Sequence, residues 1–107
     1  LADGGRKLYN TYCASCHQVN GKGVMGRFPS LSESEWVSGN KKRLISVILA
    51  GLKGPITVNG KAFDGEMPKH DFLSDDNIAK ILTYIRKNFK NNAGAIYEKD
   101  VASMRVK

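Results

Sequence analysis

Two cysteines and a histidine near the amino terminus are the residues of this chain whose types and spacing point most directly to chemistry. They lie in the run Cys13-Ala14-Ser15-Cys16-His17. Two thiols three positions apart, followed at once by an imidazole, suit covalent attachment of haem, because each thiol adds across one vinyl group and the histidine reaches the iron. The motif therefore predicts a covalently bound haem c, held through Cys13 and Cys16, whose iron carries single electrons.

Other sites built on a Cys-x-x-Cys pair fit the rest of the sequence less well. Zinc needs four ligands, and beyond the motif only His70 or a carboxylate remains, without a second pair of ligands at zinc spacing. A thioredoxin-like dithiol normally follows a strand in a chain of alternating strands and helices. This chain instead opens directly on a helix-like segment, so we retain the haem interpretation.

Met67, in the run Gly65-Glu66-Met67-Pro68, is the candidate for the second iron ligand. A thioether sulfur is a suitable soft ligand for haem iron opposite an imidazole. Pro68 fixes the adjacent backbone, and the glycines of this region let a loop close over a flat cofactor. The competing interpretation is a methionine that merely fills the core.

Rival ligands are few. Met25 follows His17 so closely that we expect it on the same side of the haem, and Met104 lies near the carboxy terminus. His70 would give bis-histidine ligation and a lower potential, but its sequence context is typical of a surface residue. An iron with one open position would instead suit a peroxidase or a gas-binding sensor, which is the alternative function.

Three helix-like segments must position these residues. The segment 2–12 has an acidic start at Asp3 and delivers Cys13 at its end. The segment 41–50 is capped by Asn40 and stopped by Gly51.

The third helix begins after Ser74, an N-cap followed by two aspartates, and carries an apolar stripe from Ile78 to Phe89. Between the second and third helices, the glycines and prolines of residues 51–73 predict turns rather than regular structure. Residues 98–104 are expected to form a short additional helix.

Composition bounds the size and location of the protein. The chain has 107 residues, 41% of them hydrophobic and 8% aromatic, so its own core would be marginal and a bound haem would supply the missing apolar surface. No apolar run approaches the roughly 20 residues that span a bilayer. The chain begins at Leu1, from which we expect a processed or excised polypeptide, and thioether assembly predicts a bacterial periplasmic location.

Charge bears on the partners. Seventeen lysines and arginines against ten acidic residues give a net charge of +7. Basic residues cluster in three places, at Lys41, Lys42 and Arg43, at Arg86, Lys87 and Lys90, and in the tail 105–107. Such clusters near a haem edge would steer the protein onto an acidic redox partner, and the alternative is an ordinary solvated surface. Nucleic-acid binding is not indicated, because no reading motif accompanies the charge.

On these motifs the chain resembles a class I c-type cytochrome over residues 2–90. The resemblance implies an all-α fold, in which three main helices with long loops wrap around one haem, as a single domain over 1–107 with a carboxy-terminal extension at 91–107. It also implies axial ligation by His17 and Met67, and outer-sphere electron transfer through a partly exposed haem edge. Such a protein is an electron carrier rather than an enzyme.

The same resemblance assigns supporting residues. The first and last helices would cross with Gly5 and Tyr9 against Ile81 and Tyr84. The carbonyl of Pro29 would accept the Nδ1 proton of the ligand histidine, although Pro29 also reads as an ordinary loop proline. Two roles stay open for Trp36, a hydrogen bond to a haem propionate or packing beside the ring. The expected apolar shell consists of Phe28, Leu31, Leu44, Ile48, Phe63, Phe72 and Ile81.

A narrower resemblance concerns partners. The runs 36–39 and 48–60 and the tail 101–105 are similar to cytochrome domains that serve periplasmic or outer-membrane dehydrogenases and some copper nitrite reductases. It implies a redox protein partner that is fused to the cytochrome or encoded beside it.

Overall fold

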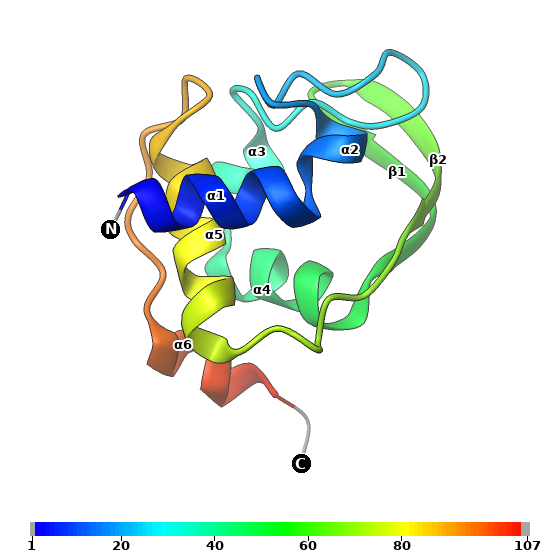
Figure 1. Cartoon of the computed structure of the whole chain (residues 1–107). Coiled ribbons are helices and arrows are strands. Elements are labelled where there is room, and N and C mark those ends of the chain that lie inside the picture. The colour runs from blue at the N-terminus through cyan, green and yellow to red at the C-terminus, as the bar shows by residue number, and fades with distance from the viewer. Residues whose placement is uncertain (1, 106–107) are drawn as a thin grey trace.

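The computed structural model, which describes residues 2–105, is mostly helical, with a two-stranded antiparallel sheet along one edge (Figure 1). In chain order the elements are α1 (Ala2–Tyr12), α2 (Ala14–His17), α3 (Glu35–Ser38), α4 (Lys41–Ala50), β1 (Leu52–Val58), β2 (Lys61–Met67), α5 (Asp75–Lys87) and α6 (Glu98–Met104) (Figure 1). The predicted helical class is confirmed, with one hairpin added to it. Within this described part, no helix has the length and apolar character needed to cross a membrane.

Capping residues set the helix starts, as the sequence predicts. The side chain of Asn40 accepts a hydrogen bond from the Arg43 amide at 3.0 Å, and Ser74 accepts one from the Asn77 amide at 3.1 Å. These bonds satisfy amides that have no partner inside the helix. The additional helix at 98–104 is also confirmed, whereas the side chain of Asp3 lies outside the described residues.

Residues 52–67 correct the prediction of irregular turns between α4 and α5. They form a β-hairpin, β1 with β2, joined at Asn59 and Gly60. Both joining residues have positive φ, 50° and 77°, which is the conformation of a two-residue hairpin turn and the reason Asn-Gly is favoured there. The glycines and prolines of this stretch masked the alternation that the strands carry.

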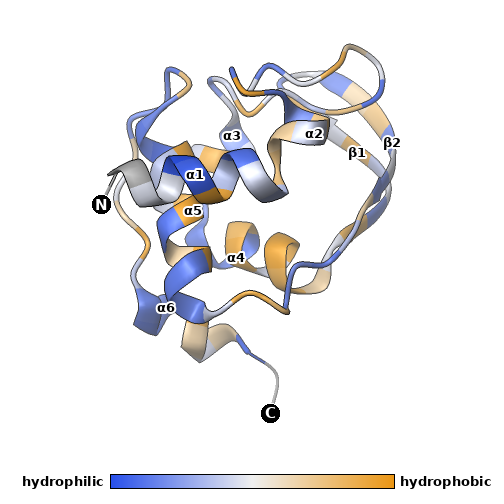
Figure 2. Ribbon diagram, viewed as in Figure 1, coloured by the Kyte–Doolittle hydropathy of each residue, from blue (hydrophilic) through white to orange (hydrophobic). Residues whose placement is uncertain are grey.

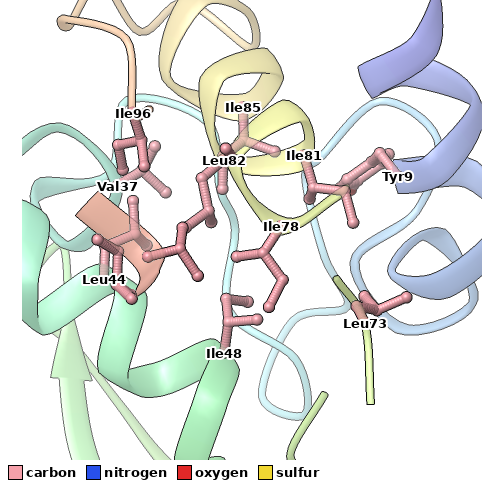
Figure 3. Close-up of a cluster of buried hydrophobic side chains, with 13 residues drawn as sticks. Tyr9, Val37, Leu44, Ile48, Leu73, Ile78, Ile81, Leu82, Ile85 and Ile96 are labelled. Atoms are coloured by element: carbon pink, nitrogen blue, oxygen red, sulfur yellow. The ribbon is translucent and has the colours of Figure 1, made fainter. Parts of the chain in front are cut away.

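The core lies where α5 meets α1 on one side and α3 and α4 on the other. In Figure 3 the side chains of Ile78, Leu82 and Ile85 stand between Tyr9 and the pair Val37 and Leu44. In Figure 2, α4 is coloured as hydrophobic over the turns that follow its basic start. This core fixes the helices whose ends carry the site residues.

The crossing of α1 and α5 is as close as the resemblance implies. A Cβ placed on Gly5 would lie 2.5 Å from the carbonyl oxygen of Lys80 and 2.9 Å from Cβ of Tyr84. The ring centroids of Tyr9 and Tyr84 are 5.7 Å apart. Glycine at position 5 therefore lets the two backbones approach, and α1 reaches Cys13 at a fixed angle.

Arg86 departs from the predicted surface cluster of basic residues. Its side chain is buried, only 4% exposed, and donates to the backbone carbonyls of Val37, Gly39 and Gly94. Burial lowers the pKa of this guanidinium. Arg86 therefore ties the start of the carboxy-terminal extension to the segment joining α3 and α4, and it adds nothing to a docking surface.

Candidate haem site

The five-residue motif forms one helical turn directly after α1. The amide of Cys13 donates to the Tyr9 carbonyl at 2.8 Å, and the amide of His17 donates to the Cys13 carbonyl at 3.0 Å. Neither cysteine is in a disulfide, and both are half-buried. Before haem is attached, burial, with a smaller contribution from Cys16, raises the pKa of Cys13 to about 11, so this thiol is protonated at neutral pH.

His17 is held in one tautomer. Its Nδ1 lies 2.9 Å from the carbonyl oxygen of Pro29. Because a carbonyl only accepts, Nδ1 carries the proton and Nε2 keeps a free lone pair. Burial lowers the pKa of His17, and the bond to Pro29 only partly opposes that shift, so the ring is neutral, as a metal ligand must be.

The loop that follows α2 brings the Pro29 carbonyl to the histidine. The amide of Gly23 donates to the His17 carbonyl at 2.9 Å, and Val24 and Phe28 exchange backbone hydrogen bonds. A Cβ on Gly23 would lie 2.7 Å from the Pro29 carbonyl oxygen, and φ at this glycine is +69°. The loop packs too tightly at Gly23 for any side chain, and this packing holds the Pro29 carbonyl toward Nδ1 of His17.

The hairpin positions Met67 by its register. Leu52 pairs with Met67, Gly54 with Gly65, and Ile56 with Phe63, and all six residues line the cavity described below. Strand side chains alternate between faces, so this register places the Met67 side chain on the face that carries Leu52, Ile56 and Phe63. Sequence reasoning missed Leu52 and Ile56, although their alternation before Asn59-Gly60 is a strand signal.

Two adjoining cavities lie between the motif and the hairpin. The outer one measures about 390 Å³ and is lined by Cys16, and the inner one measures about 80 Å³ and is lined by Cys13. The residues that line both cavities are His17, Pro29, Leu52, Ile56 and Met67. The two thiols, the imidazole and the thioether thus line two adjoining cavities.

The shape of this space fits a flat macrocycle. A Cβ placed on Gly54 or Gly65 would have no neighbouring atom within 4 Å, so this pair leaves room against the backbone of the hairpin. The inner cavity is lined largely by apolar side chains, which α4, α5 and β1 among other segments supply. Together with two thiols, a neutral imidazole and a thioether, these features match the donor set and the dry walls that a covalent haem needs.

Most of the predicted apolar shell lines the cavities. Phe28 and Phe63 line the outer cavity, and the residues lining the inner one include Leu31, Leu44, Ile48 and Ile81. The prediction for Phe72 is wrong, because this ring is 68% exposed, lines neither cavity and meets the Tyr12 ring edge to face, with centroids 5.8 Å apart. Leu73, the next residue, takes the buried position, since successive residues of this turn point in different directions.

Trp36 lines the inner cavity, and its single N–H has a protein acceptor. Nε1 donates to the Thr57 carbonyl at 2.8 Å, and the guanidinium of Arg43 lies 4.2 Å from the ring centroid. The N–H that a haem propionate would need is therefore already bonded within the protein. The indole joins α3 to the hairpin.

The rival ligands lie elsewhere. Nδ1 of His70 is 2.9 Å from the Pro68 carbonyl oxygen, and His70 lines neither cavity. Met25 is 88% exposed, and Met104 packs against the core from α6. Met67 is therefore the methionine that the fold brings to His17 among the described residues.

Comparison with known proteins places this site in a family. The family model for cytochrome c matches residues 2–89. Over 85 residues the chain is 41% identical to cytochrome c-552 of Thermus thermophilus, a match that covers 76% of this chain and 64% of that relative. The chain thus spans less than two thirds of the length of this relative.

Two further relatives have names that mention larger assemblies. One is the cytochrome c subunit of a quinone alcohol dehydrogenase from Gluconobacter oxydans, 29% identical over 95% of this chain and 22% of that subunit. Another is subunit FixP of a cbb3-type cytochrome c oxidase from Bradyrhizobium diazoefficiens, 28% identical over 77% of this chain and 28% of that subunit. With the thiols and the imidazole assembled as described, this chain belongs to the cytochrome c family, has its class I fold, and forms an electron-transfer domain with haem c attached covalently through Cys13 and Cys16.

Proposed function

We propose that this domain relays single electrons with its iron held by His17 on one side and Met67 on the other. The observation that supports this assignment is the meeting of the two side chains in one cavity, His17 from α2 and Met67 from the end of β2. When bound, the haem supplies an iron that alternates between the ferrous and ferric states. The protein residues hold that iron and keep water away.

The roles of the surrounding groups follow from their contacts. Pro29 keeps the proton on Nδ1 of His17, which leaves Nε2 to the metal and makes the imidazole a stronger donor. Leu44, Ile48 and Ile81 make the inner wall apolar. His17 and Met67 would hold a bound haem iron while this wall keeps water out, which would favour electron transfer over bond-making chemistry. A methionine ligand also favours a high potential.

The test of Met67 is spectroscopic. Ferric iron bonded to methionine gives a weak absorption band at the red end of the visible spectrum, and Met67→Ala is expected to abolish it and to open the ferrous iron to carbon monoxide. Met25→Ala is the matched control, because that side chain is 88% exposed, and its spectrum is expected to be unchanged. Persistence of the band in Met67→Ala would contradict the assignment. Fast binding of carbon monoxide by the unmodified protein would favour a gas-binding or peroxidase role.

We further propose a partner with an acidic docking surface, on the strength of the net charge of +7. A net positive charge of this size attracts an acidic partner over a distance, and it speeds encounter without forming a tight complex. Electron transfer from an anionic iron complex is therefore expected to slow as salt is added, and transfer from a cationic one to accelerate. Equal salt dependence for both reagents would contradict charge steering.

We also propose a periplasmic setting and a catalytic partner, fused or co-encoded, of the dehydrogenase or reductase class. The support is the relative that is a cytochrome c subunit of a quinone alcohol dehydrogenase, matched along 95% of this chain. The gene encoding this chain, read with its neighbours, tests the proposal. A catalytic module in the same reading frame or operon is the expected result, and an isolated gene without one would contradict it.

A further inference from the structure

Arg105, in the carboxy-terminal extension, grips the turn that leads from Met67 to α5. Its Nε donates to Oδ1 of Asp75 at 2.6 Å, its Nη1 to the Asp71 carbonyl at 2.8 Å, and its Nη2 to the Leu73 carbonyl at 2.5 Å. One guanidinium thus joins two backbone carbonyls of the turn and a carboxylate in the first turn of α5. Charge-assisted bonds of this kind are stronger than neutral ones.

The gripped turn is the continuation of the strand that ends at Met67. At its near end, the His70 amide donates to the Ile48 carbonyl at 2.7 Å. At the same end, a Cβ placed on Gly51 would lie 2.6 Å from the Met67 carbonyl oxygen, so α4 packs directly on this backbone. Arg105 supplies the far attachment. Between these two attachments the segment has little freedom to move away from the cavity.

The platform behind Arg105 is itself fixed. Val101, in the middle of α6, is fully buried, and Met104 packs against the core cluster. At the start of α6, the Asp100 carboxylate accepts the Tyr97 amide at 2.8 Å. Figure 1 shows α6 below α5, on the side where the segment after β2 arrives. The extension therefore presents Arg105 from a folded element, so the grip has a rigid base.

We propose that Arg105 is a positioning residue for Met67, a latch through which the extension keeps the thioether on the iron. The proposal rests on the Met67 ligation proposed above. A thioether is a soft, uncharged ligand and holds ferric iron less firmly than ferrous iron. Retention of the ferric bond therefore depends on how often the Met67 segment swings outward, and Arg105 restrains that motion.

The experiment follows imidazole entering the ferric holoprotein, with the red methionine band as the signal. At saturating imidazole the rate is set by departure of Met67. Arg105→Ala removes charge-assisted hydrogen bonds and is expected to raise that rate by about tenfold or more. Lys99→Ala is the control, since it removes one positive charge from an exposed position of α6 for which the described residues show no hydrogen bond or ion pair. Its rate is expected to match that of the unmodified protein.

The outcomes separate the latch from the ligand assignment and from a purely structural role. Absence of the red band in the unmodified protein, or its survival in Met67→Ala, would overturn the ligation itself. If ligation holds and Arg105→Ala keeps the unmodified rate, the latch is refuted, even where its melting temperature falls. If Arg105→Ala does not fold, the imidazole rate is measured instead for Arg105→Gln, which retains a neutral hydrogen-bond donor. An unmodified rate in that variant equally refutes the latch, and faster hydrogen exchange over residues 68–74 accompanies the expected result.

Discussion

Replacing Gly5 by alanine tests whether the α1–α5 crossing is as close as the structure has it. The added methyl group would lie 2.5 Å from the Lys80 carbonyl oxygen and 2.9 Å from Tyr84 Cβ. Since backbone is the nearer obstacle, α1 must shift, and overpacking of this kind costs about 1–3 kcal/mol. Against that cost stands the gain of helix propensity on replacing glycine by alanine, up to about 1 kcal/mol.

Gly4→Ala is the matched control because it changes the neighbouring residue of the same helix. A Cβ there meets only Cδ of Lys80, at 3.8 Å, which is ordinary contact. This variant therefore gains propensity without the clash, and the difference between the two variants isolates the crossing. We expect Gly5→Ala to be less stable than Gly4→Ala by about 1–3 kcal/mol.

The assay is urea unfolding of both ferric holoproteins, with the free energy of unfolding obtained by linear extrapolation. Equal midpoints for Gly4→Ala and Gly5→Ala would refute the reasoning, because both variants would then have gained propensity and neither would have met an obstacle. A fall in Gly5→Ala with a changed slope would instead indicate an altered denatured state.

Three further predictions concern side chains that donate to backbone carbonyls. Tyr9→Phe removes the hydroxyl that donates to the Gln18 carbonyl at 2.6 Å, at a cost of about 0.5–1.5 kcal/mol near pH 7. Burial raises the pKa of Tyr9 in the folded state, so the contribution of its hydroxyl to the free energy of unfolding is complete below the pKa of the unfolded chain. That contribution is lost as the pH rises above about 10, by about 1.4 kcal/mol at pH 11. Urea titrations of Tyr9→Phe and the unmodified protein that stay parallel from pH 7 to 11 would contradict this. Arg86→Met leaves three carbonyls without a donor and is expected to lower the free energy of unfolding by about 3–5 kcal/mol, and a loss below about 1 kcal/mol would show that the carbonyls find other donors. Trp36→Phe is expected to lower the free energy of unfolding by about 0.5–1.5 kcal/mol, because the hydrogen bond to the Thr57 carbonyl is lost. It is expected to leave the pH dependence of the reduction potential unchanged, and a changed dependence would indicate that the indole bonds a haem propionate.

Motif chemistry and helix signals in the sequence predicted much of the site and most of the scaffold. The spacing of Cys13, Cys16 and His17 is local, so its reading does not depend on the rest of the fold. Caps such as Asn40 and Ser74 are also local, and both helices begin where these residues predict. Met67 was predicted as a ligand because few soft ligands compete with it, and its place with His17 on the lining of one cavity supports the ligation that we propose.

What the sequence did not predict depends on contacts between distant residues. The hairpin was missed because Gly54, Pro55 and Gly65 read as breakers, whereas in the structure the two glycines face each other and leave space. The exposure of Phe72 depends on the path of a turn, which hydrophobicity does not reveal. The grip of Arg105 joins it to Asp75, thirty positions earlier along the chain, and no pattern marks that contact.

Because the turn at Asn59 and Gly60 sets the register of the hairpin, it also determines which side chains of β2 face the cavity. Because side chains alternate along a strand, deleting one residue between Gly60 and Met67 would turn the thioether outward and bring Glu66 or a bulge to the cavity. Lengthening both strands by two residues would keep the thioether on the inner face. Natural or designed variation in this hairpin is therefore restricted by parity, because the number of residues between Met67 and a surface turn decides whether the proposed iron ligand faces the cavity.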